Sequence, residues 1–180
     1  MSIVRIGFVG PVQAGKTTIA EFYTEVTSNP NFGEYHPTQG LRILETGRKI
    51  NGIENTVQVQ VWDISGDPQY EAYMSKLSIQ LDGVVIVCPG TDLRLTQTCK
   101  KYYQMIVDEE RVGKYGHVIC LLHKAGTPVA EEMYIEDKQL ASIPVYRTCM
   151  EVDKEQIFEI IDGLVEKIAK KQLNEGDMLE

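Results

Sequence analysis

The chain has 180 residues, of which 43% are hydrophobic and 24% are charged, so we expect a folded globular domain rather than a disordered or fibrous protein. Its formal net charge of −8 at pH 7 disfavours nucleic-acid binding, because a polyphosphate repels an acidic chain and the sequence shows no local basic patch.

The four cysteines show no CxxC spacing, and two of them lie in apolar runs where a thiol behaves as a small hydrophobe, which favours a reducing, cytosolic-type compartment. The longest apolar stretch, residues 84–88, is far shorter than the ~20 residues of a membrane-spanning helix. Neither a signal peptide nor a lipidation motif is expected, since residue 2 is serine and the sequence ends in DMLE. We therefore expect no direct membrane anchor.

In chain order, residues 3–9 are apolar and rich in β-branched side chains, which predicts a strand followed by a loop at Gly10. A helix is predicted next and is expected to end at Asn29-Pro30, because one face carries Ile19, Phe22, Tyr23 and Val26. Residues 31–40 predict an exposed loop. Residues 41–45 and 56–63 predict two strands joined by a turn at Asn51-Gly52.

The second half predicts two central strands, at 84–88 and 118–122, which are continuously apolar as in a parallel sheet. A helix lies between them, with Leu95, Cys99, Tyr102 and Ile106 on one face. A final helix is predicted from an apolar stripe at Ile157, Ile160, Ile161, Leu164, Val165 and Ile168, with a capping box at Asp153 and Gln156. This alternation predicts an α/β fold: a single doubly wound, mostly parallel sheet with helices on both faces. We place the domain at 1–172, followed by a short flexible tail at 173–180.

Residues 10–17, GPVQAGKT, fit the phosphate-loop pattern, and they stand where a predicted strand ends and a helix begins. Backbone N–H groups in such a loop converge on a polyphosphate, the lysine neutralises it, and the threonine hydroxyl binds Mg²⁺. The alternative is a glycine-rich turn with a solvated lysine. The candidate phosphate-binding residues are Gly10, Val12, Gln13, Ala14, Gly15, Lys16, Thr17 and Thr18.

Three residues outside that loop complete the predicted phosphate site. Asp63 ends an alternating strand and is a candidate second magnesium anchor beside Thr17. Gly66 offers a backbone N–H to a γ-phosphate, and the Thr38 hydroxyl can complete the magnesium shell in the triphosphate state.

In these motifs and their order the chain resembles the small Ras-like GTPases, which are P-loop NTPases, over almost all of its length. Within them it resembles the Rab-like subunit of intraflagellar transport complex B, the Rab-like five group. The closer resemblance rests on FVGP at 8–11, PTQG at 37–40 with RILE at 42–45, WD at 62–63 with GD at 66–67, GVVIV at 83–87, and HK at 123–124 before Gly126.

The resemblance implies GTP/GDP and Mg²⁺ as cofactors and a role in building cilia or flagella. It also implies a partner, a coiled-coil heterodimer of the same complex bound through the switch segments, and a location in the cytoplasm, the cilium or flagellum and its basal body. The loop at Thr148, Cys149 and Met150 is expected to recognise guanine through its backbone, with the Lys124 stem over the base.

Two departures from the family pattern change these expectations. Gly126 stands where the family has the aspartate that binds guanine, so affinity is expected to fall by a factor on the order of 10². Asp67 replaces the water-positioning glutamine and Val12 replaces a glycine, so hydrolysis is expected to be slow or absent. Asp67 is the one weak catalytic candidate, with a surface carboxylate as the preferred alternative. His123 is either a packed histidine or a base contact.

Different function classes remain open at this level. One is a nucleotide-switched binding module whose contact surface includes Tyr35, His36, Trp62, Tyr70 and Tyr73, with Trp62 alternatively in the core. Another is a P-loop ATPase or kinase acting on a small substrate, which the isolated arginines do not favour because such kinases carry an arginine-bearing lid. A third is a scaffold that binds nucleotide permanently.

Overall fold

The computed structural model describes residues 3–27, 36–107, 112–124, 134–152 and 154–177. A six-stranded sheet has the order β2 (Leu41–Arg48), β3 (Val57–Ile64), β1 (Ile3–Val9), β4 (Gly83–Pro89), β5 (Val118–His123) and β6 (Val145–Thr148). The helices are α1 (Lys16–Tyr23), the 3₁₀ turn η1 (Pro68–Tyr70), α2 (Glu71–Ser78), α3 (Leu95–Ile106) and α4 (Lys154–Asp177).

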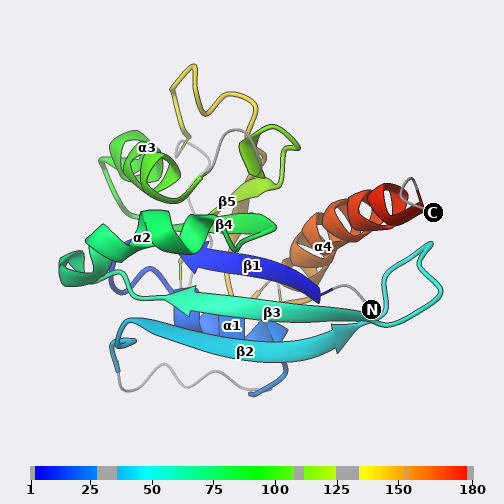
Figure 1. The fold of residues 1–180 in the computed structure, drawn as a ribbon. Coiled ribbons are helices and arrows are strands. Elements are labelled where there is room, and N and C mark those ends of the chain that lie inside the picture. The colour runs from blue at the N-terminus through cyan, green and yellow to red at the C-terminus, as the bar shows by residue number, and fades with distance from the viewer. Residues whose placement is uncertain (1–2, 28–35, 108–111, 125–133, 153, 178–180) are drawn as a thin grey trace.

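Only β2 runs antiparallel to its neighbour, and the other pairs in the described sheet are parallel (Figure 1). The predicted doubly wound α/β fold is therefore confirmed. Parallel strands end at a common edge, and in such sheets the loops at that edge bind ligands. The loops after β1, β3, β4 and β5 all leave from this edge.

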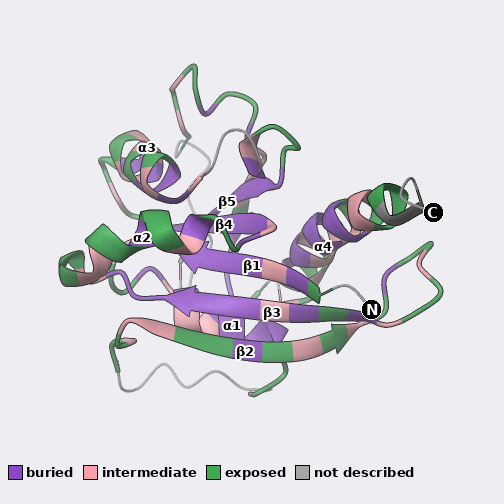
Figure 2. Ribbon diagram, in the orientation of Figure 1, coloured by how far each residue is buried: buried purple, intermediate pink, exposed green. Residues whose placement is uncertain are grey.

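The core has two layers because alternate strand residues point to opposite faces of the sheet. On one face Val85 and Val87 pack with the apolar sides of α1 and α4. On the other face Val84 and Ile86 pack with α2 and α3. Figure 2 shows the central strands buried almost throughout, as expected of strands covered on both sides.

Helix α1 ends earlier than predicted, at Tyr23 instead of the Asn29-Pro30 step, which lies outside the described residues. The Thr24 hydroxyl donates to the Ala20 carbonyl at 2.7 Å, and Glu25 takes a left-handed conformation with φ 58°. Val26 is consequently 56% exposed instead of lying on the buried helical face. The helix ends in a Schellman motif: with Glu25 left-handed, the Val26 N–H donates to the Glu21 carbonyl and the Glu25 N–H donates to the Phe22 carbonyl, both at 3.0 Å.

At the other end of the chain, α4 continues through residue 172 to Asp177, so 173–177 of the predicted tail are helical. The division into a domain at 1–172 and a tail stays a prediction. Ile157, Ile161, Leu164, Val165 and Ile168 of the predicted stripe are buried. Ile160 is partly buried, and Asp153 of the capping box is outside the described residues. Among the described helices, none has the combination of length and apolar character needed to cross a bilayer.

An ion pair joins β2 to α1 and α4 far from the strand edge described above. Arg48 donates to both carboxylate oxygens of Asp162, at 3.0 and 2.7 Å, and its guanidinium lies 5.0 and 4.7 Å from the ring centroids of Tyr23 and Phe158. The Tyr23 hydroxyl donates to Asp162 at 2.7 Å, and burial together with this carboxylate raises the pKa of Tyr23.

We expect Arg48→Met to lower the free energy of unfolding by about 1–3 kcal/mol, because it removes a bidentate charge-assisted pair and leaves Asp162 half-paired. Urea denaturation followed by circular dichroism measures this. Lys101→Met is the matched control: Lys101 pairs with Glu71 but has a side chain 51% exposed, and less than about 1 kcal/mol is expected. Equal losses in both variants would contradict the assignment.

Candidate phosphate and nucleotide site

A cavity of about 940 Å³ opens at the carboxyl edge of the sheet, between the loop after β1 and the segment preceding β2. Nine predicted site residues line it: Gln13, Ala14, Gly15, Lys16, Thr17, Thr18, Thr38, Gly66 and Lys124. The volume is within the range of small-molecule and cofactor sites. The sequence motifs separated by more than a hundred residues therefore share one cavity.

The loop after β1 needs glycine at two positions, Gly10 and Gly15. Gly10 has φ 147°, and a Cβ there would lie 2.0 Å from the Val87 carbonyl oxygen. Gly15 has φ 92° and lies against the His123 ring, where a Cβ would be 2.5 Å from Cδ2. Gln13 is left-handed without being glycine, with φ 60°. Such a loop leads directly into α1, whose N-terminal amides favour an anion.

Lys16 is a buried cation, with 6% of its surface exposed. Its ammonium group donates to the carbonyls of Gly10 at 2.9 Å and Pro11 at 2.8 Å. Burial lowers the pKa of Lys16 to about 8, against the attraction of Asp63, which raises it. A charge held on two carbonyls inside a cavity is well placed to move onto an incoming phosphate.

Thr17, Thr38 and Asp63 form one hydrogen-bonded group, although they come from α1, the segment before β2, and β3. Thr17 and Thr38 donate to the same oxygen, Asp63 Oδ2, at 2.7 and 2.9 Å, and their hydroxyl oxygens are 2.9 Å apart. Asp63 is fully buried, and burial raises its pKa although both threonines and Lys16 favour its charged form. The three predicted magnesium anchors thus lie together.

The donor set fits a hard divalent cation. Asp63 Oδ1 is buried and has no hydrogen-bond partner among the described residues, so one carboxylate oxygen remains available as a ligand. Two hydroxyls and a carboxylate are the oxygen ligands that Mg²⁺ prefers. Thr17, Thr38 and Asp63 would hold the ion, directly or through water, and the ion would neutralise phosphate charge.

The base side of the cavity is formed by the ends of β5 and β6. Lys124 lines the cavity, and its backbone N–H donates to the Thr148 carbonyl at 3.1 Å. The loop expected to recognise guanine is buried: Thr148, Cys149 and Met150 are at most 1% exposed. None of the three is among the described residues that line the cavity, so any contact with a base there comes from the backbone. That contact stays a prediction, and Gly126 lies outside the described residues.

His123 is a packed histidine, as one of its two interpretations expected, but it also lines the cavity, so a contact with the base stays a prediction. It is 4% exposed, its ring lies under Gly15, and its Nδ1 shares a hydrogen bond of 3.1 Å with the Thr148 hydroxyl. Burial lowers the pKa of His123 to about 4, so the ring is neutral near pH 7. One neutral ring thereby joins the phosphate loop to the end of β6.

This buried ring predicts an acid-sensitive fold. The unfolded chain binds the His123 proton with a pKa near 6.5 and the folded chain only near 4, so stability is lost as the pH falls through this interval, by roughly 3 kcal/mol. Denaturation of the wild type and of His123→Gln at pH 7 and pH 4.5 measures it. The wild type should lose more stability than the variant, and an equal loss would contradict the prediction.

Seven of the predicted site residues are not among the described residues that line the cavity: Gly10, Val12, Asp63, Asp67, Thr148, Cys149 and Met150. Val12 is 45% exposed. Asp67 accepts from the backbone N–H and the side-chain amide of Gln69, at 3.0 and 2.9 Å, and so caps η1. A capping role favours the surface-carboxylate interpretation of Asp67 over water positioning.

Sequence reasoning missed several cavity residues, among them Arg42, Glu21 and Pro89. Arg42 and Glu21 form an ion pair beside the cavity, which no local pattern indicates.

The aromatic residues of the expected contact surface differ in exposure. Trp62 is 6% exposed and belongs to the core, while Tyr73 is 58% exposed, and Tyr35 lies outside the described residues.

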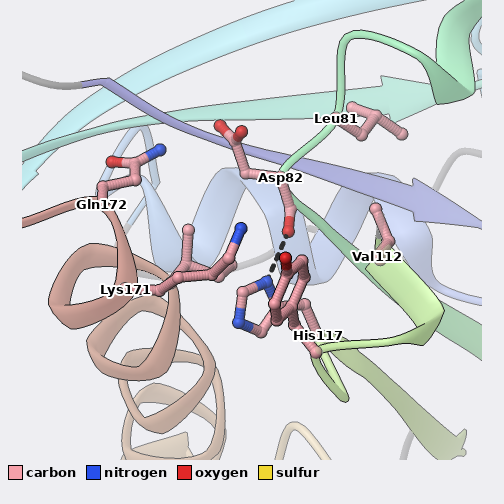
Figure 3. Close-up of a pocket in the computed structure, with 8 residues that line it drawn as sticks. Leu81, Asp82, Val112, His117, Lys171 and Gln172 are labelled. Carbon is pink, nitrogen blue, oxygen red and sulfur yellow. Dashed lines mark hydrogen bonds between the residues drawn. The ribbon is translucent and has the colours of Figure 1, made fainter. Parts of the chain in front are cut away.

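A second, much smaller cavity lies at the opposite edge of the sheet (Figure 3). Its volume is about 40 Å³, enough for roughly one water molecule. His117 Nδ1–H donates to the Asp82 carbonyl at 3.1 Å, and the Lys171 ammonium lies 3.6 Å from the centroid of the Tyr115 ring. Its size excludes a nucleotide.

Comparison with known proteins is consistent with this geometry. The family model described as Ras of Complex, Roc, domain of DAPkinase matches residues 5–125. Intraflagellar transport protein 22 of Trypanosoma brucei brucei is 28% identical over 207 residues, covering 99% of this chain and 92% of the relative. The Bos taurus homolog of intraflagellar transport protein 22 is 29% identical over 160 residues, covering 85% and 83%.

Two solved structures share the fold. The GTP-bound crystal structure of T. brucei IFT22/74/81 aligns with a TM-score of 0.76 at 24% identity, covering 97% of this chain and 99% of the matched chain. The GDP-bound T. brucei IFT22 structure aligns with a TM-score of 0.69 at 23% identity, covering 96% and 99%.

Proposed function

Because the chain belongs to the Ras-like GTPases of the Roc family, we propose that it is a guanine-nucleotide-binding, GTPase-like subunit of intraflagellar transport complex B. In this proposal it acts as a nucleotide-dependent binding module in the assembly of cilia or flagella. The relatives named intraflagellar transport protein 22 support this assignment. Its locations are the cytoplasm, the cilium or flagellum, and the basal body.

The observation that carries the proposal is the double contact of Thr38. This residue belongs to the segment before β2, yet its hydroxyl donates to Asp63 near the end of β3 and lies 2.9 Å from the hydroxyl of Thr17 of the phosphate loop. A nucleotide and its Mg²⁺ at these atoms would hold that segment, and loss of the γ-phosphate would release it. The site therefore connects phosphate chemistry to a surface segment.

Guanine is the proposed base. A backbone N–H at Cys149 would donate to guanine O6 but would oppose the amino donor of adenine, so the preference does not depend on an aspartate at Gly126. The Lys124 stem lines the same cavity. Competition of GTP and ATP against a fluorescent guanosine analogue tests this, and equal inhibition by ATP would overturn it. The nucleotide released from the denatured purified protein gives a second readout.

Hydrolysis is proposed to be slow or absent. Both oxygens of Asp67 accept hydrogen bonds from Gln69, and a carboxylate cannot donate to an attacking water as an amide can. Single-turnover measurement of phosphate release from bound GTP, without any activator, tests this rate. A rate equal to that of an efficient Ras-like enzyme would contradict it.

The proposed partner is a coiled-coil heterodimer of the same complex, bound through the segments around Thr38 and Gly66. The T. brucei relative was crystallised with IFT74 and IFT81, which supports a partner of this kind. Tyr73 and Ile43, beside those segments, are 58% and 45% exposed and so are accessible for contact. Partner affinity measured with GDP and with a GTP analogue separates a switch from a permanently loaded scaffold, for which the two affinities would be equal.

The alternative of a P-loop kinase or ATPase gains no support from the site. Arg42 is the single arginine among the described residues that line the cavity, and it pairs with Glu21. A kinase of this class needs arginines free to close on the transferred phosphate.

A further inference from the structure

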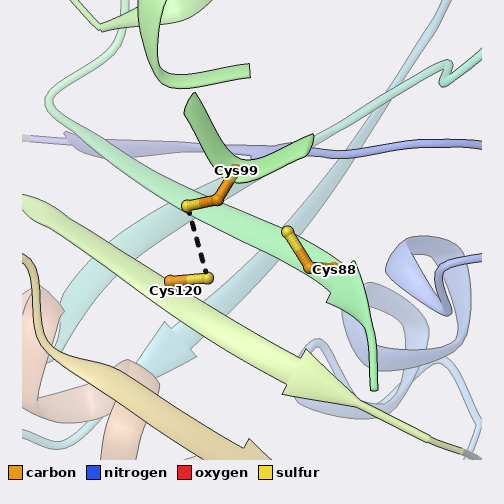
Figure 4. A group of neighbouring side chains, drawn as sticks. All are labelled: Cys88, Cys99 and Cys120. Atoms are coloured by element: carbon orange, nitrogen blue, oxygen red, sulfur yellow. Dashed lines mark hydrogen bonds between the residues drawn. The ribbon is translucent and has the colours of Figure 1, made fainter. Parts of the chain in front are cut away.

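Three cysteines from three different elements meet in the core, away from the nucleotide cavity. Cys88 ends the apolar part of β4, Cys120 lies in β5, and Cys99 lies on the face of α3 that covers both strands (Figure 4). All three are fully buried, and their sulfur atoms lie within 4.8 Å of one another, with Cys99 and Cys120 3.7 Å apart. We call them the thiol cluster.

We propose that the thiol cluster is a binding site for one soft, thiolate-preferring metal ion, Cu(I), coordinated by the sulfur atoms of Cys88, Cys99 and Cys120.

The spacing of the sulfur atoms matches a three-coordinate ion. With metal–sulfur bonds of about 2.3 Å in one plane, the three sulfurs would lie about 4 Å from one another. The observed 3.7 Å between Cys99 and Cys120, and the 4.8 Å limit for all three, bracket this value. Coordination therefore needs only small side-chain adjustments.

The ligand number and surroundings favour Cu(I) over Zn²⁺. Structural zinc is almost always four-coordinate, whereas no fourth histidine, cysteine or carboxylate joins the group among the described residues. Thiolates prefer soft ions such as Cu(I). The thiol cluster belongs to the same buried apolar core as Val9, Leu95 and Leu122, and a buried apolar core offers no water as a fourth ligand.

The test is an anaerobic titration of the reduced, nucleotide-loaded protein with Cu(I), in competition with a chromophoric Cu(I) chelator. We expect one equivalent to bind, with a thiolate-to-copper absorption band in the ultraviolet and a rise in melting temperature. Zn²⁺ should bind more weakly in the same assay. Failure to bind one equivalent, or tighter binding of Zn²⁺, would overturn the proposal.

Val165 provides a matched control, since it is also fully buried but lies in the core on the other face of the sheet. Cys99→Ala should lower Cu(I) affinity at least about a hundredfold, more than the loss of an outer-shell partner usually costs. Val165→Ala should leave it unchanged. If Cys99→Ala does not fold, the wild-type titration decides alone. Equal Cu(I) affinity in both variants would overturn the proposed copper site. Oxidation of Cys99 and Cys120 to a disulfide with no metal bound would overturn it as well.

Discussion

Replacement of Lys16 with alanine is expected to weaken binding of both GTP and GDP by about 10²–10⁴-fold, since two charge-assisted hydrogen bonds contribute about 1.5–3 kcal/mol each. The ammonium group now donates to the carbonyls of Gly10 and Pro11, inside the predicted phosphate loop. The affinity for both nucleotides should fall, because the β-phosphate is common to GTP and GDP. Titration with a fluorescent guanosine analogue measures the effect.

Lys76→Ala is the control, because Lys76 is an exposed lysine on α2 and should not change nucleotide affinity. The pH dependence supplies an independent readout. Since burial lowers the pKa of Lys16 to about 8, the wild type should lose affinity as the pH rises above 8, where the amine becomes neutral. Lys16→Ala should lack this loss. A folded variant that binds as firmly as the wild type would refute the site.

The elements predicted correctly from sequence are those whose burial is visible locally. The continuous apolar runs at 84–88 and 118–122 became β4 and β5, and the stripe on α4 faces the sheet. Helix α2 went unpredicted because eight residues with only Met74 and Ser78 buried give too little periodicity. Strand β6 has four residues at the sheet edge, which is too short for an alternating pattern.

The same distinction applies to the site. The phosphate loop is contiguous in sequence, so residues 10–17 alone predict its chemistry. The packing of His123 under Gly15 is not, because it depends on the closeness of β5 to β1 across β4. Likewise the sequence predicts Thr38 and Asp63 as magnesium ligands, but the hydrogen bond between them joins residues 25 positions apart and follows from the fold. Tertiary contacts of this kind leave no local sequence signal.

Asp63→Asn is expected to remove the magnesium dependence of nucleotide binding while leaving the fold intact. In the wild type, chelating Mg²⁺ should speed nucleotide release at least about tenfold, by analogy with the cost of disturbing a metal site. In the variant the change should be less than about twofold on the same scale, because a neutral amide is a poor ligand for a hard cation. Release of a fluorescent nucleotide, with and without EDTA, measures both.

The folding stability of Asp63→Asn should not fall along with its magnesium dependence, and this separates an effect on the site from misfolding. Burial raises the pKa of Asp63 above its ordinary value, so without a bound cation stability is lost as the pH rises through the folded-state pKa. Asp63→Asn removes that charge, so the nucleotide-free variant should be at least as stable as the wild type at pH 7. A variant that is less stable and also binds poorly would show a structural role instead.

Thr38→Ala distinguishes the two nucleotide states at the same site. Thr38 contacts Asp63 and Thr17 from the segment before β2, which only the triphosphate is proposed to hold, whereas Thr17 is proposed to bind Mg²⁺ in both states. We therefore expect Thr38→Ala to weaken binding of a GTP analogue with Mg²⁺ and to leave GDP affinity within about twofold, since it removes one hydroxyl ligand in one state only. Equal weakening for both nucleotides would show that Thr38 supports the cavity generally and does not sense the γ-phosphate.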